Sequence, residues 1–141
     1  MSDRALRTAV GILATAGAAI AGYLTYARLT DTTLACATGG CEIVQRSDYA
    51  ELAGIPVALL GLAAYVFVLG TAFTSSEPAR VAAAAVAVAG AAFSAYLVYI
   101  QIAVIDAICQ WCVASDIVMA LLAAACVGRV VGPGPRAEPT S

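Results

Sequence analysis

The sequence VAAAAVAVAGAAFSAYLVYIQIAVI, residues 81–105, contains 25 consecutive residues without a charge. A helix needs about 20 apolar residues to cross about 30 Å of hydrocarbon. Two comparable windows lie upstream, at residues 8–27 and 52–76, and a fourth, 107–128, is interrupted only by Asp116. Together these windows predict four transmembrane helices, over about residues 8–27, 55–74, 81–105 and 109–130.

The composition agrees with a membrane bundle. Of the 141 residues, 62% are hydrophobic and 11% are charged, whereas a soluble domain typically carries about 25% charged residues. The chain has no His, and its net charge of -2 offers no basic field for nucleic acid. We expect an all-α integral membrane protein, with one four-transmembrane-helix domain at residues 1–131 and a disordered cytoplasmic tail at residues 132–141.

The arginines predict the orientation of the bundle. Cytoplasmic loops of membrane proteins carry an excess of basic residues. With the N-terminus inside, only Arg28 and Arg46 lie outside, and the other five are cytoplasmic: Arg4, Arg7, Arg80, Arg129 and Arg136. This predicts a multi-pass protein of the inner (cytoplasmic) membrane, with both termini in the cytoplasm.

Four cysteines form two pairs, Cys36/Cys41 and Cys109/Cys112, and two spans separate them. By parity both pairs emerge on the same side, the extracytoplasmic side, where disulfides form and persist. Cys109 and Cys112 have Cys-x-x-Cys spacing at the start of span 4, where a helix N-terminus favours the thiolate that attacks disulfides. The pairs predict thiol–disulfide exchange. Static disulfides and a four-thiolate zinc site remain as alternatives.

The loop after span 1 contains a second pattern. Ile43, Ser47, Ala50 and Gly54 recur at helical spacing, as a stripe of small and apolar residues. This predicts a short amphipathic helix in the first extracytoplasmic loop that lies over the bundle with its apolar side down. Ser47 is then the one hydroxyl that faces the membrane.

Asp116 and several aromatic residues complete the candidate site. Asp116 lies one helical turn below Cys112 on the same face. An acid at membrane depth costs about 2.5–3.5 kcal/mol, so Asp116 either relays a proton to a bound acceptor or faces a polar cavity near the interface. Five aromatic residues map to the outer helix ends, where they either form an interfacial belt or line a pocket for a flat ring: Tyr23, Tyr26, Tyr96, Tyr99 and Trp111.

These features together resemble the vitamin K epoxide reductase family, in particular its bacterial disulfide-forming members. The resemblance covers residues 8 to 130 and rests on the order and spacing of four motifs: Cys36/Cys41, Ser47, Gly54-Ile55-Pro56 and Cys109-Gln110-Trp111-Cys112. Many bacterial members carry a fused thioredoxin-like domain, whereas this chain stops at Ser141. We therefore expect the thioredoxin-fold partner, a DsbA-like thiol oxidase, to be a separate protein.

The resemblance implies a role for each matching residue. Cys36 receives electrons from the partner, Cys41 passes them to Cys109, and Cys112 completes their transfer to a membrane quinone, menaquinone or ubiquinone. Ser47 donates a hydrogen bond to a quinone oxygen, and the quinone-binding residues expected beside it are Cys112, Asp116 and Trp111. No metal is expected.

Two alternative functions remain at this point. Vertebrate members have a Thr-Thr-Tyr run after the second cysteine, where this chain has Val113-Ala114-Ser115-Asp116. This disfavours reduction of the epoxide, and a quinone or vitamin K epoxide reductase with another thiol donor is the second hypothesis. A non-enzymatic membrane protein with structural disulfides or a zinc site is the third reading. The convergent DsbB-type oxidases carry Cys-x-x-Cys in the first outer loop rather than the second, which disfavours them.

Overall fold

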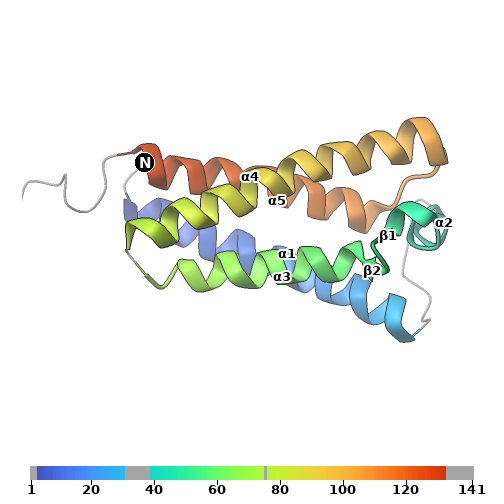
Figure 1. The fold of residues 1–141 in the computed structure, drawn as a ribbon, viewed down its shortest axis with the longest axis horizontal. Helices are drawn as coiled ribbons and strands as arrows, with labels where there is room; N and C mark the ends of the chain where they lie inside the picture. Colours follow the sequence, from blue (N-terminus) through green and yellow to red (C-terminus); the bar gives the residue numbers. More distant parts are fainter. Residues whose placement is uncertain (1–2, 31–38, 75, 133–141) are drawn as a thin grey trace, which may run out of the picture.

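The computed structural model describes residues 3–30, 39–74 and 76–132 of the chain. Four apolar helices run side by side along the molecule (Figure 1). They are α1 (Asp3–Thr30), α3 (Val57–Thr71), α4 (Glu77–Tyr99) and α5 (Gln110–Val131), and α4 continues into a π-helix, η2 (Ile100–Ile105). The fold is therefore the predicted helical membrane architecture. The predicted cytoplasmic tail lies, apart from Gly132, outside the described residues.

Three of these helices are long enough and apolar enough to cross a membrane, namely Arg4–Thr30, Glu77–Ile105 and Gln110–Val131. The helix α3 has only 15 residues, which gives it a length of about 22 Å. The predicted span at residues 55–74 is therefore too long at both ends. Ile55 and Pro56 pair with another strand, and the segment after Thr71 turns toward α4.

The segment between α1 and α3 forms a cap over one end of the bundle, and this cap differs from the predicted amphipathic helix. Its elements are α2 (Cys41–Gln45), the 3₁₀ helix η1 (Asp48–Ala50) and a two-stranded hairpin of β1 (Glu51–Leu52) and β2 (Ile55–Pro56). The prediction of one continuous helix from Ile43 to Gly54 is wrong, because Ser47 is extended and the chain reverses at Ala53 and Gly54. Both turn residues have positive φ, as a tight hairpin requires.

Small residues allow the helices to approach closely in the core. Tyr65 of α3 is fully buried, and its ring occupies the space where a side chain at Gly17 of α1 would lie. Gly90 of α4 makes similar room for Met119 of α5. Close backbone approach of this kind is typical of helix packing in lipid, where dispersion contacts replace the hydrophobic effect.

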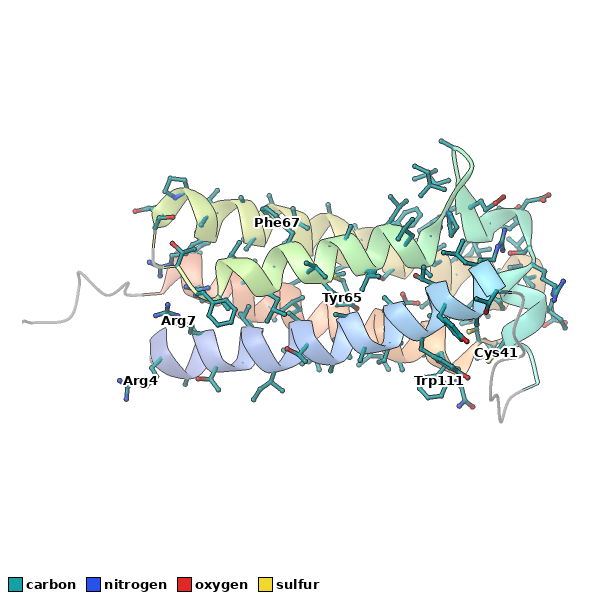
Figure 2. All side chains as sticks on the ribbon, turned by 90° about the horizontal axis from the view of Figure 1, so that it is seen from below. Arg4, Arg7, Cys41, Tyr65, Phe67 and Trp111 are labelled. Carbon is teal, nitrogen blue, oxygen red and sulfur yellow. The ribbon has the colours of Figure 1, made fainter. Side chains whose placement is uncertain are left out.

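Arginines gather at the end of the bundle opposite the cap. Arg7 Nε donates to the Ala72 carbonyl at 2.5 Å, Arg80 donates to the Arg129 carbonyl, and Arg129 donates to the Thr74 carbonyl at 3.3 Å. These bonds satisfy carbonyls at helix ends, where cations are favoured. Figure 2 shows Arg4 and Arg7 at this end and Cys41 and Trp111 at the other. The two cysteine segments thus share one end of the bundle.

Candidate active site at the capped end of the bundle

The Cys-x-x-Cys motif opens α5. Cys109 is the N-cap residue of this helix, and its Sγ accepts a hydrogen bond from the Cys112 backbone N–H at 3.3 Å. Cys109 is fully buried, whereas Cys112 is partly exposed. Both cysteines carry thiols in this structure. The start of α5 therefore buries Cys109 and leaves Cys112 partly exposed.

A close backbone contact joins the cap to the start of α5. A Cβ added at Gly40 would lie 2.5 Å from the Ile108 carbonyl oxygen and 2.7 Å from its nitrogen. Such distances are far shorter than van der Waals contact, so only glycine fits here. Cys41 and Cys109 follow Gly40 and Ile108 directly in the two segments that meet here. Gly40 thus brings the first turn of α2 against the Cys-x-x-Cys motif.

Cys41 and Cys109 belong to one buried cluster with Leu24, Ala27 and Val44. Both cysteines are 0% exposed. Cys41 is disulfide-bonded, while its predicted partner, Cys36, lies outside the described residues. The structure therefore brings together one cysteine of the loop pair and one of the Cys-x-x-Cys pair in a dry environment.

A cavity of about 210 Å³ lies below the cap, between α3, α4 and α5. Its surface is mostly apolar, and three of the predicted quinone-binding residues line it: Ser47, Cys112 and Asp116. Concave apolar sites with a few converging polar groups are typical of small-molecule binding. The second sulfur of the Cys-x-x-Cys motif therefore faces a site suited to a flat, lipid-soluble molecule.

Two polar pairs line the deeper part of this cavity. Asp116 forms a side-chain hydrogen bond with Ser94 of α4, and its Oδ2 atom is buried without a hydrogen-bond partner. Tyr65 of α3 donates from its hydroxyl to the Ser115 carbonyl oxygen at 2.7 Å. A buried carboxylate oxygen with no partner is costly, so Asp116 is suited to contact a polar atom of a bound molecule.

The Ser47 hydroxyl already has an acceptor. Its Oγ donates to the Val44 carbonyl at 2.7 Å, within the turn that ends α2. A hydroxyl has one proton to donate, so in this conformation Ser47 offers a lone pair to the cavity rather than a proton. The predicted donation from Ser47 to a quinone oxygen requires the hydroxyl to leave Val44.

Trp111 is placed differently from the other predicted quinone-binding residues. It is not among the residues that line the cavity. Its ring instead packs edge-on against Tyr23, with ring centroids 5.2 Å apart. Tyr26, Tyr96 and Tyr99 are likewise absent from the lining and are largely exposed, which agrees with an aromatic belt at the membrane interface.

Gln101 was missed by the reasoning from sequence. It lies in η2, is only 2% exposed and lines the cavity. Its side-chain Oε1 accepts a hydrogen bond from the Cys109 backbone N–H at 2.8 Å. The available signal was one amide inside the 25-residue uncharged window at 81–105, because polar residues at membrane depth usually have a function.

No group of three or more metal-ligating side chains occurs within residues 3–30, 39–74 and 76–132. Cys41 is in a disulfide and so cannot act as a thiolate ligand in this state.

The model of the vitamin K epoxide reductase family matches residues 8–127. The matched segment begins in α1 and ends in α5, so it includes the cap, the cavity and the Cys-x-x-Cys motif.

Proposed function

Because the chain belongs to the vitamin K epoxide reductase family, whose members are quinone-linked membrane oxidoreductases, we propose that it oxidises the dithiol of a thioredoxin-fold partner and reduces a membrane quinone. The observation that carries this proposal is the position of Cys112. It shares the helix start with the buried Cys109 and also lines the apolar cavity. One thiol pair thus contacts both the loop cysteine and the site of the acceptor.

The electrons pass in three balanced steps. The partner dithiol reduces the Cys36–Cys41 disulfide and becomes a disulfide itself. The Cys41 thiolate then attacks Cys109 of the Cys109–Cys112 disulfide and releases Cys112, and Cys36 attacks the resulting Cys41–Cys109 disulfide, which frees Cys109 and restores the loop disulfide. The dithiol of Cys109 and Cys112 finally gives two electrons and two protons to the quinone, which leaves as quinol. Burial of Cys41 and Cys109 in one cluster supports the second step.

The cavity residues act in the third step. Cys112 lies nearest the quinone ring, and Asp116, one turn deeper, relays one of the two protons from the thiol pair to the developing quinol oxygen. The unpartnered Oδ2 of Asp116 supports this role. Ser47 accepts a hydrogen bond from the quinol hydroxyl at the cap, since its own proton is engaged by Val44. Trp111 holds the outer turn of α5 through Tyr23.

The orientation belongs to the same proposal. We assign the arginine-rich end to the cytoplasm and the capped end to the extracytoplasmic side of the inner membrane, following the bias of basic residues. The contacts of Arg7, Arg80 and Arg129 at one end support this assignment. In an oxidising compartment on the capped side, the disulfides that the partner passes on to other proteins persist.

The direct test follows quinone absorbance with the purified protein in detergent, a reduced thioredoxin-fold partner and a soluble quinone. Cys112→Ala should abolish quinone reduction. Cys126→Ala is the matched control, because Cys126 is a buried thiol in the bundle core, away from the cavity, and this variant should reduce quinone at the wild-type rate. A silent wild-type protein, or an active Cys112→Ala variant, would refute the proposal.

A further inference from the structure

Gln101 is a buried amide whose hydrogen bonding is only partly satisfied by the protein. Its backbone oxygen accepts from the Ala107 N–H at 3.0 Å, and its side-chain oxygen accepts from the Cys109 N–H at 2.8 Å. These bonds hold the short connection between η2 and α5. They leave the two N–H groups of the side-chain amide to be accounted for.

The contact with Cys109 fixes the orientation of this amide. A backbone N–H is only a donor, so the atom that faces it must be Oε1 and not Nε2. The planar amide then turns Nε2 away from Cys109. Nε2 is not among the buried polar atoms that lack a partner, and Gln101 lines the cavity. Because Gln101 lines the cavity, a molecule bound there can accept a hydrogen bond from this amide nitrogen.

A quinone needs such a donor at the capped end of the cavity. The two carbonyl oxygens of a quinone can only accept hydrogen bonds, and the Ser47 hydroxyl already donates its proton to the Val44 carbonyl. Gln101 and Cys112 line the same cavity, and Gln101 also contacts the backbone of Cys109. The amide thus lies within reach of a quinone carbonyl oxygen that is bound next to the Cys112 sulfur.

We propose that Gln101 donates a hydrogen bond from Nε2 to the quinone carbonyl nearest the Cys-x-x-Cys motif, with its donor orientation set by the Cys109 N–H. This rests on the proposed quinone reduction. The amide transfers no proton; it holds the ring beside Cys112 and stabilises the negative charge that develops on that oxygen during reduction. The same side chain therefore positions both the thiol pair and the acceptor.

Infrared difference spectroscopy of bound quinone, carrying ¹³C in its carbonyl groups, tests the donation directly. A donated hydrogen bond lowers the carbonyl stretching frequency, so Gln101→Met should raise the frequency of one carbonyl. Ser47→Ala should leave both frequencies at the wild-type values. Gln101→Met should also raise the KM for quinone about tenfold, as expected for loss of one hydrogen bond. A shift in Ser47→Ala with none in Gln101→Met would overturn the inference.

A measurement on the wild-type protein covers the case in which Gln101→Met fails to fold. The chain has only three glutamines, Gln45, Gln101 and Gln110, so ¹⁵N labelling of glutamine side chains gives few signals to assign. Adding quinone should move the Gln101 amide protons downfield. If wild type reduces quinone and these protons do not move, the role of Gln101 falls while the proposed function stands. If wild type neither binds nor reduces quinone, both fall.

Discussion

The contact between Gly40 and Ile108 gives a quantitative prediction for the exchange between Cys41 and Cys109. An alanine Cβ at position 40 would lie 2.5 Å from the Ile108 carbonyl oxygen, whereas ordinary contact begins at 3.4 Å. The opposing atoms are backbone, so they cannot rotate away. Gly40→Ala therefore has to separate the two segments by about 0.9 Å. A displacement of about 1 Å can slow a positioned reaction about 100-fold.

A cross-linking assay measures this effect without the partner or the quinone. In a Cys36→Ser/Cys112→Ser background, mild oxidation joins Cys41 to Cys109, and the rate is followed by mass spectrometry. Gly40→Ala should slow the cross-link about 100-fold. Gly39→Ala is the matched control: Gly39 has a φ of 76° but nothing within 4 Å of its added Cβ, so this variant costs only about 1 kcal/mol of backbone strain.

The result that refutes the reasoning is equal cross-linking in the two variants. In that case the cap either relaxes around the alanine or lies at a different distance from α5 in solution. Circular dichroism melts of both variants separate this outcome from unfolding. A Gly40→Ala protein that keeps its helices but loses the cross-link supports the structural explanation.

Three further predictions concern the cavity floor, the core and the cap. Asp116→Asn keeps an oxygen for the Ser94 contact but removes the acidic proton, so quinone reduction should fall about 100-fold with an unchanged thiol titration; an unaltered rate would exclude proton delivery by Asp116. Gly17→Ala should destabilise the bundle by about 1–3 kcal/mol, because its Cβ would overlap the Tyr65 ring. Gly11→Ala, with nothing within 4 Å, should be neutral in the same thermal melts, and equal melts would contradict the packing. The Arg28–Glu51 ion pair, 3.0 Å apart and partly exposed, should couple by no more than about 1 kcal/mol in a double-mutant cycle, and a larger coupling would show a more buried contact.

The sequence predicted the long helices well because a long, uncharged and mostly apolar segment is what a helix needs in order to lie in lipid. The 81–105 window became α4 together with η2, and the start of α5 follows Cys109 directly. The error at α3 has a local cause. Ile55, the first residue of the predicted span, is as apolar as a span requires, but the positive φ at Ala53 and Gly54 places it in a hairpin opposite Leu52. Turn geometry of this kind does not appear in a count of charges.

The site was predicted in part for a similar reason. Motif spacing identified Cys41, Cys109 and Cys112, because cysteine pairs are rare and chemically distinctive. It did not identify Gln101, because the contacts of that residue with the Cys109 backbone and with the cavity are set by the fold and leave no motif in the sequence. Nor did it show that Trp111 packs on Tyr23 outside the cavity, since the rotation of a helix depends on its neighbours.

The hydrogen bond from the Cys112 N–H to Cys109 Sγ has a consequence for the direction of electron flow. A thiolate accepts such a bond more strongly than a disulfide sulfur does, so the bond favours the reduced pair and raises its reduction potential. For a two-electron couple, about 1.4 kcal/mol corresponds to about 30 mV. In the relay that we propose, the first turn of α5 would thereby favour electron transfer from the loop pair to Cys109 and Cys112, and the quinone would provide the remaining driving force.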